Sequence, residues 1–164
     1  MFREMRRKKQ ALSKQETLDI FERNTSGVLA VLGDEEYPYA VPLSYTYCDS
    51  KLYFHGAKSG HKLDAIQNHD KASFCIIDKD QIVPDEYTTY FRSAIAFGKI
   101  RILEEEAEKR AAIEKLAIKY TPNNEEGCMQ EIAKEFKFLC MIELDIEHMT
   151  GKEAIELVRE KQKQ

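Results

Sequence analysis

The chain has 164 residues, 43% of them hydrophobic and 33% charged, a balance that suits one globular domain with a hydrophobic core. Its 29 acidic residues outnumber the 25 basic ones, and the formal net charge of -4 argues against nucleic acid as the main partner. No apolar window approaches the roughly 18–20 residues that a membrane span requires. No apolar segment of signal length follows the basic N-terminal run. We therefore expect a soluble cytoplasmic protein that binds neither nucleic acid nor membrane.

Cysteine and histidine patterns do not indicate a metal centre. Four cysteines are spread along the chain without a C-x-x-C pair, which is typical of reduced, buried thiols. His55 and His61 are six residues apart and have no thiolate or carboxylate cluster beside them, so we expect no metal site. The cysteines are Cys48, Cys75, Cys128 and Cys140.

Taken in chain order, the elements predict a mostly β domain with peripheral helices. Ser13 and Glu16 form a capping box at the start of a first helix. Short β-rich runs separated by turn residues then predict antiparallel strands at the spacing of a meander or barrel. Pro42 falls inside one run and is expected at an edge or a bulge, because it cannot donate to a ladder. The predicted strands are residues 27–32, 39–47, 51–55, 72–78, 87–103 and 138–146.

Further helices are predicted after the third and fifth strands, and residues 79–86 are predicted to form a loop. Glu104 begins an acidic triplet that the helix dipole favours at an N-terminus, and this helix should end at Tyr120. Residues 126–137 are also predicted to be helical. We expect a basic N-terminal segment over residues 1–12, one domain over residues 13–150, and a charged, helical tail over residues 151–164.

The segment 52–66 carries the clearest functional signal. It predicts a short aromatic strand, a loop of small and basic residues, and a helix that begins near His61 and Lys62. A cation at a helix start is unfavourable by roughly 0.3–1 kcal/mol, and a bound anion would reverse that sign. Free backbone N–H groups, small residues and cationic side chains together favour a phosphate site. The alternative is a solvated turn that happens to be basic.

The order of elements and several segments resemble the pyridoxamine-phosphate-oxidase-like flavin-binding split barrels. Within that group the chain is most similar to the 5-nitroimidazole-resistance (Nim) proteins. The resemblance implies a six-stranded antiparallel split β-barrel that holds FMN at a homodimer interface. It places the isoalloxazine against the second strand and the phosphate on the strand–loop–helix corner. The segments that carry the likeness are residues 27–30, 38–45, 52–62 and 93–100.

Carried over by position, the resemblance also implies roles for individual residues. Tyr45 would either stack on the flavin ring or pack the barrel. His55 would face the flavin, either as a catalytic group that donates a proton near neutral pH or as a structural hydrogen-bond partner. Ser93 would reach the flavin from the partner subunit. The implied cofactor-binding residues are Pro42, Leu43, Ser44, Tyr45, His55, Gly56, Ala57, Lys58, Ser59, Gly60, His61, Lys62 and Ser93.

The function implied by the resemblance is FMN-dependent reduction of a small acceptor, such as a nitroaromatic, with electrons from a nicotinamide cofactor. No G-x-G-x-x-G fingerprint occurs, so NAD(P)H would bind only transiently. The alternatives are a non-catalytic flavin carrier or sensor, and a site for another phosphorylated ligand such as pyridoxal phosphate or a deazaflavin. Pyridoxamine-phosphate oxidation is disfavoured, because the chain has no Trp and its tail is rich in Glu and Lys.

Overall fold

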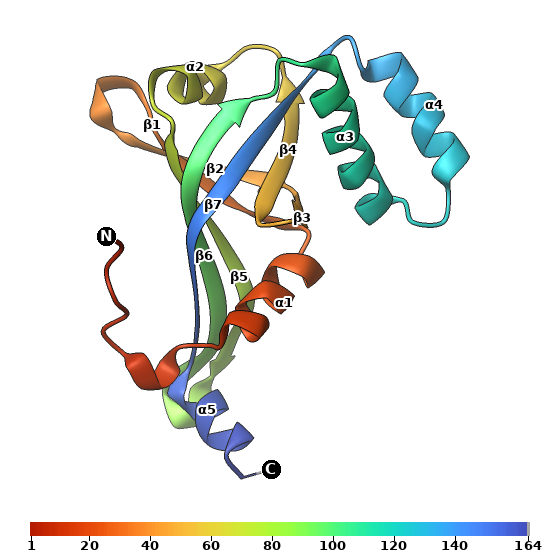
Figure 1. The fold of residues 1–164 in the computed structure, drawn as a ribbon. Coiled ribbons are helices and arrows are strands. Elements are labelled where there is room, and N and C mark those ends of the chain that lie inside the picture. Colours follow the sequence, from red (N-terminus) through yellow and green to blue (C-terminus); the bar gives the residue numbers. More distant parts are fainter. Residues whose placement is uncertain (164) are drawn as a thin grey trace.

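A computed structural model describes residues 1–163 and places seven strands of that range in one antiparallel sheet (Figure 1). The strand order across the sheet is β2-β1-β5-β6-β7-β4-β3, so β2 and β3 form its two edges. The sequence predicts six strands, whereas the described residues form seven. The strands are β1 (Ser26–Leu32), β2 (Pro38–Ser44), β3 (Thr46–Cys48), β4 (Lys51–Ala57), β5 (Lys71–Val83), β6 (Thr88–Ile102) and β7 (Leu139–Glu153).

Five helices of the described range surround the sheet. Figure 1 shows α3 and α4 beside β4 at one end of the molecule, with α1 and α5 along the long strands β5, β6 and β7 at the other. Across residues 1–163, no helix is both long and apolar enough to cross a membrane. The helices are α1 (Lys14–Arg23), α2 (His61–Asn68), α3 (Glu106–Tyr120), α4 (Glu125–Glu135) and α5 (Ile155–Lys161), with 3-10 turns at Lys8–Gln10, Asp34–Glu36 and Pro84–Glu86.

The capping box predicted for the first helix is confirmed. The Glu16 N–H donates to Ser13 Oγ at 3.2 Å, and the Ser13 N–H donates to Glu16 Oε2 at 2.8 Å. One face of α1 buries Thr17, Ile20 and Phe21. These contacts lay the helix against the sheet, where Thr17 lies over the end of β7.

The segment predicted as one strand over residues 39–47 is interrupted at Tyr45 and not at Pro42. Pro42 lies within β2 opposite Val28, and an edge strand tolerates a residue without an N–H group. The Tyr45 side chain is fully buried, and its hydroxyl donates to the Phe21 carbonyl oxygen at 2.7 Å. The strand thus ends where Tyr45 enters the core, a tertiary contact that local sequence does not reveal.

The prediction of a loop over residues 79–86 is wrong for most of its length. β5 continues to Val83 and pairs with β6 as far as Thr88, which leaves residues 84–86 as the turn. A register shift between Ile77 and Lys79 interrupts the alternation of the strand. Polar side chains on an exposed two-stranded ribbon hide its strand periodicity, so the pattern is typical of a loop. β7 likewise runs past its predicted end, to Glu153.

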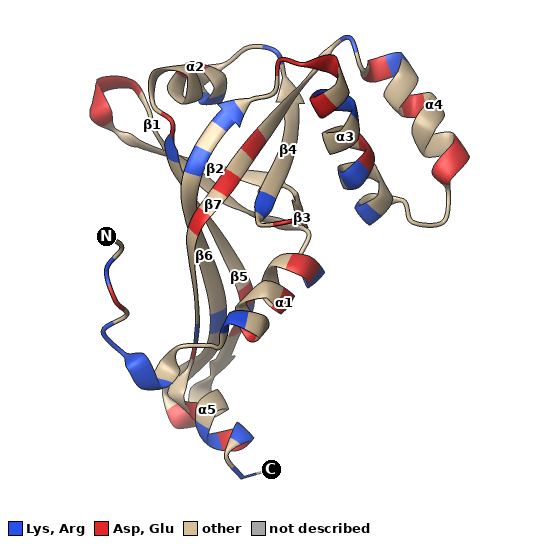
Figure 2. Ribbon diagram, in the orientation of Figure 1, with Lys and Arg blue, Asp and Glu red and all other residues tan. Residues whose placement is uncertain are grey.

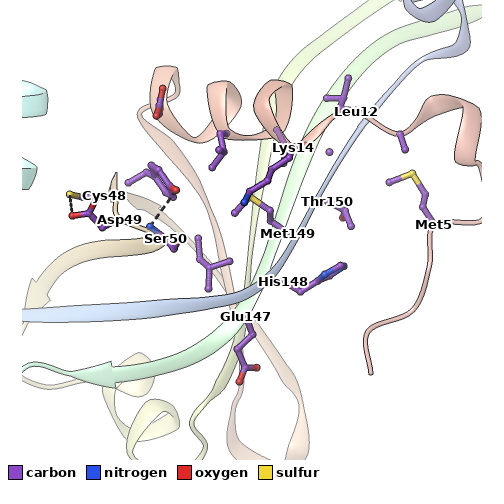
Figure 3. A pocket seen from close by; sticks show the side chains of 17 residues that line it. Met5, Leu12, Lys14, Cys48, Asp49, Ser50, Glu147, His148, Met149 and Thr150 are labelled. Carbon is purple, nitrogen blue, oxygen red and sulfur yellow. Dashed lines mark hydrogen bonds between the residues drawn. The ribbon is translucent and has the colours of Figure 1, made fainter.

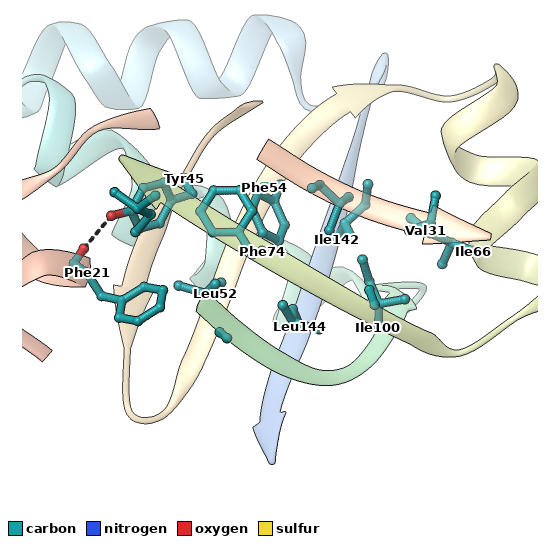
Figure 4. Packing of buried hydrophobic residues seen from close by; sticks show 14 of the residues in the cluster. Phe21, Val31, Tyr45, Leu52, Phe54, Ile66, Phe74, Ile100, Ile142 and Leu144 are labelled. Carbon is teal, nitrogen blue, oxygen red and sulfur yellow. Dashed lines mark hydrogen bonds between the residues drawn. The ribbon is translucent and has the colours of Figure 1, made fainter. Parts of the chain in front are cut away.

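Two clusters of buried apolar residues pack against the two faces of β4. The first lies among the strands, α1 and α2, where the Phe54 and Phe74 rings are 5.1 Å apart (Figure 4). The second lies under α3 and α4 and contains Tyr53 and Met141. Because successive residues of β4 point into different clusters, the strand is a rigid support for the loop that follows it.

Buried carboxylates connect α1 and α5 to the long strands. The side chain of Glu153 is only 3% exposed and has two cationic partners. Asp78 is 7% exposed and also has two. Figure 2 shows acidic and basic residues interspersed along the helices at this end of the molecule. The ion pairs are Arg92–Glu153 at 3.0 Å, Lys161–Glu153 at 2.7 Å, Lys161–Glu16 at 2.6 Å, Arg23–Asp78 at 2.6 Å and Arg92–Asp78 at 3.5 Å.

Candidate functional site

The predicted corner is formed by the end of β4, a three-residue loop and the first turn of α2. Gly60 occupies the N-cap position with φ +128°, a conformation that side chains rarely adopt, and open space surrounds the place where a Cβ would be. No side chain caps the helix. The first N–H groups of α2 are therefore not satisfied by a capping side chain, as an anion-binding helix start requires.

Lys62 reaches back from α2 over the end of β4. Its Nζ atom lies 3.0 Å from the position that a Cβ on Gly56 would occupy, so only a glycine leaves this space open. Burial lowers the pKa of the Lys62 ammonium. In the described part of the chain, neither Lys58 nor Lys62 forms an ion pair with a carboxylate. Two uncompensated cations at an uncapped helix start fit an anionic group.

A third lysine, which the sequence reasoning missed, belongs to the same corner. Lys109 of α3 lies near Cys140, which is opposite Gly56 in the β4–β7 pair. The positive charges of Lys109, Lys62 and Lys58 each act to lower the pKa of the Cys140 thiol, although burial dominates and raises it. Lys109 is about fifty positions from the predicted loop, so no local pattern could have identified it.

His55 lies on β4 beside this corner and is exposed. Burial, followed by the positive charge of Lys62, lowers the pKa of its imidazole below 6.5. The ring is therefore mostly neutral near pH 7, when one nitrogen donates a hydrogen bond and the other accepts one. Both roles considered for His55, catalytic and structural, remain compatible with this position.

His61 points away from the other predicted phosphate ligands. Its ring stacks on Tyr39 with centroids 4.2 Å apart and packs over Gly33 in the β1–β2 turn. The Asp34 N–H donates to His61 Nε2 at 3.3 Å. The side chain thus joins α2 to the β1–β2 hairpin, and its role as a phosphate contact remains a prediction.

The predicted flavin-lining segment lies on the edge strand β2 and the residue after it. Pro42 and Ser44 are exposed, whereas Leu43 packs against the core. Tyr45 packs edge-on against Phe74 at 4.9 Å, and its N–H is already close to the Tyr120 hydroxyl at 3.2 Å. Of the two roles considered for Tyr45, this geometry favours packing in the core over stacking on a ligand.

Ser93 does not meet the corner within one chain. It lies opposite Lys152 on β7, whereas Gly56 lies opposite Cys140. These two positions on β7 are about 12 residues apart, which corresponds to roughly 40 Å along a strand. Ser93 therefore lies far along β7 from the corner of its own chain.

Ser93 belongs to a sheet face that we call the outer face, on the side away from the buried core. Register and alternation place side chains of β2, β1, β5, β6 and β7 together on it. By the same register Lys152, which is opposite Ser93, lies at its border, and Ile77 is 68% exposed. Phe2 of the N-terminal arm stacks on His148 at one border. The outer face comprises Val28, Ala30, Ala40, Pro42, Ser44, Ser73, Cys75, Ile77, Ser93, Ile95, Phe97, His148 and Thr150.

An open cleft of about 1050 Å³ lies between α1, the β3–β4 turn and β7 (Figure 3). Its lining mixes acidic and basic groups such as Lys14 and Glu147 with apolar ones such as Met149. None of the cofactor-binding residues predicted from the sequence lines it. The mixed lining indicates no particular class of ligand.

The family model described as pyridoxamine 5'-phosphate oxidase matches residues 13–153. None of the curated proteins compared with the chain matches it. Three solved structures are similar across most of the chain. A proposed 5-nitroimidazole antibiotic resistance protein of Bacteroides thetaiotaomicron has a TM-score of 0.71 and 21% identity, covering 87% of this chain and 85% of that one.

A conserved protein from Mycobacterium tuberculosis has a TM-score of 0.78 and 17% identity, covering 92% of this chain and 90% of that one. An FAD-binding protein from Mesorhizobium loti has a TM-score of 0.62 and 24% identity, covering 88% of this chain and 97% of that one. These likenesses show a shared fold, the split-barrel type expected from the sequence.

Proposed function

Because the chain belongs to the pyridoxamine 5'-phosphate oxidase family, we propose that it binds FMN with the phosphate at the corner between β4 and α2. The observation that carries this proposal is the pair of cations, Lys58 and Lys62, that lack carboxylate partners beside an uncapped helix start. A phosphate dianion would compensate both charges and accept hydrogen bonds from the free N–H groups. Gly56 keeps the space open for the Lys62 ammonium.

The remaining parts of the ligand would follow the strands. β2 is an edge of the sheet, so its outward main-chain groups at residues 42–44 are available to a planar ring. We expect His55, which is exposed on β4, to donate a hydrogen bond or to hold a proton beside that ring. A bound flavin supplies the redox chemistry itself, and the protein binds it, orients it and controls access to it.

We propose that the reaction is reduction of a small acceptor, such as a nitroaromatic, with electrons from a nicotinamide cofactor. Support comes from the likeness to the proposed 5-nitroimidazole antibiotic resistance protein.

The second candidate is a flavin carrier or sensor without turnover. It is favoured by the mixed lining of the open cleft, which offers no defined substrate site. Pyridoxamine-phosphate oxidation is the least favoured activity, because the chain has no Trp and its tail over residues 151–164 is rich in Glu and Lys.

A homodimer is part of this proposal. A sheet face of mostly small and apolar residues, with the exposed Ile77 on it and Lys152 at its border, is typical of an interaction surface. Ser93 lies on it, and in the proposed dimer it would reach the flavin of the other copy. Sedimentation of the FMN-loaded protein should give the mass of two chains, and a mass of one chain would contradict the dimer. Ile77→Asp should weaken association, whereas Ile118→Asp, at a 62% exposed site on α3, should not.

An anaerobic absorption titration tests the function. Purified protein is titrated with FMN, in parallel with FAD, and then treated with NADPH and a nitroimidazole. Binding of about one FMN per chain, bleaching by NADPH and recovery with the acceptor would support the oxidoreductase. Tight binding without this cycle would favour the carrier or sensor, and no flavin binding would contradict both.

A further inference from the structure

Three lysines from different elements converge on the end of the β4–β7 pair. Lys62 comes from α2, Lys58 from the preceding loop, and Lys109 from α3. The Lys62 Nζ atom lies at Gly56, which is opposite Cys140, and Lys58 follows Ala57, which is opposite Leu139. The Lys109 Nζ atom donates to the carbonyl oxygen of Phe136, three residues before Leu139. Burial, with the charge of Lys58 second, lowers the pKa of Lys109, which shows that these two ammonium groups oppose one another.

The position of Lys109 is determined by α4 and not by a carboxylate. Its Nζ atom donates to the Phe136 carbonyl oxygen at 2.9 Å and lies 4.5 Å from the centroid of the Phe136 ring. No carboxylate in residues 1–163 forms an ion pair with it. One of its three N–H groups is used in this way, and the others remain free for a ligand. The ammonium is therefore held in place before any ligand arrives, which reduces the entropy lost on binding.

We propose that Lys109 is a third cationic ligand of the flavin phosphate, so that α3 carries part of the cofactor site. This inference rests on the proposed function. Three positive charges without a counter-ion repel one another, and a phosphate dianion replaces that repulsion with charge-assisted hydrogen bonds. The neutral ring and ribityl chain would gain nothing from the same lysine. The effect should therefore depend on the phosphate.

Arg110 provides a matched control. Its guanidinium lies 4.7 Å from the same Phe136 ring, so it shares the structural contact of Lys109 with α4. Unlike Lys109, Arg110 does not act on the pKa of the Cys140 thiol. It does not act on the pKa of Lys109 either. If Lys109 only supports α4, the two variants should behave alike.

The experiment measures dissociation constants of FMN and riboflavin for the full chain and for Lys109→Gln, Lys109→Arg and Arg110→Gln. Lys109→Gln should weaken FMN binding by about 10-fold or more, the loss expected for a hydrogen bond to a charged group, and leave riboflavin within about twofold. Lys109→Arg should retain most of the FMN affinity, and Arg110→Gln should retain all of it. A parallel titration with FAD shows whether the protein prefers a flavin with a diphosphate to FMN. If Lys109→Gln weakens FAD binding, that result also supports the inference.

Unchanged FMN affinity in Lys109→Gln would overturn the inference while the proposed function stands. Equal losses for FMN and riboflavin would overturn it too, because a structural role through Phe136 acts on both ligands. If the unmodified protein binds no flavin, the proposed function fails and this inference with it. Circular dichroism of each variant verifies that the fold is intact.

Discussion

Two sets of charged residues in this molecule are arranged in opposite ways, one where α1 and α5 meet the long strands and one at the corner between β4 and α2. Where α1 and α5 meet the long strands, the buried carboxylates Glu153 and Asp78 each have two cationic partners. At the corner between β4 and α2, Lys58, Lys62 and Lys109 have no carboxylate partner among the described residues. Because an uncompensated charge away from water is unfavourable, balanced charge indicates a structural role. At the corner, Lys58 is exposed and Lys62 and Lys109 are half-buried, so a bound anion would compensate charges that water now solvates in part.

The largest expected effect concerns the balanced end. Glu153→Gln should lower the free energy of unfolding by about 3 kcal/mol, since it leaves Arg92 and Lys161 without their shared buried carboxylate. The estimate is at the low end for a broken buried pair because both cations retain some solvent. Urea unfolding measures the change, with Glu160→Gln on exposed α5 as the control. A loss below about 1 kcal/mol would mean that the network is not needed for stability.

The second-largest expected effect is on FMN affinity at the corner between β4 and α2, where the lysines lack carboxylate partners. Lys62→Glu places a negative charge against the proposed phosphate and should raise the dissociation constant of FMN by about 100-fold, or about 2.7 kcal/mol. Its effect on the free energy of unfolding should be small, because Lys62 has no partner to lose. Flavin fluorescence gives the affinity, and Lys134→Glu on α4 is the control. An unchanged dissociation constant would exclude Lys62 as a ligand.

A smaller effect is expected from pH at the balanced end. The Lys161 ammonium, with the N–H and hydroxyl of Ser13, lowers the pKa of Glu16 from 4.5 to about 2. A carboxylate with a lowered pKa stabilises the fold above pH 4.5, and that stabilisation is lost as the pH falls toward 2. Its side chain is 41% exposed, so solvent screening limits the contribution to about 1 kcal/mol.

This prediction is tested by comparing unfolding of the unmodified protein and Glu16→Gln from pH 7 downward. The difference in unfolding free energy should be constant above pH 5 and shrink below it. A difference that does not change with pH would show that Glu16 acts through shape and capping and not through its charge.

The smallest expected effect is a change in the pKa of the His55 imidazole. Burial is the main cause of its lowered pKa, and the charge of Lys62 is the second. Lys62→Gln should therefore raise the pKa of His55 while leaving it below 6.5, because burial remains. NMR titration of the imidazole measures this shift. A value above 6.5 in the variant would make Lys62, and not burial, the main cause.

Local patterns in the sequence predicted the elements whose signals lie within a few residues. The capping box of α1, the strand β1 and the helix start after Gly60 all depend on neighbours within one turn or one strand. The candidate corner was predictable for the same reason, since Gly56, Lys58 and Lys62 lie in one short segment. The end of β2 was not, because it depends on a hydrogen bond from Tyr45 to α1.

Composition and local pattern by themselves determined the mostly β class of this protein, its first helix and the basic corner, because propensity, capping and short-range spacing act along the chain. Only the tertiary structure decided which cations share that corner and which way His61 points. It also decided how far Ser93 lies from the corner. Lys109 is near the corner because α3 packs on β4, and the His61 ring is held by Tyr39 and the β1–β2 turn. Contacts between residues distant in sequence come from packing, which short-range patterns do not record.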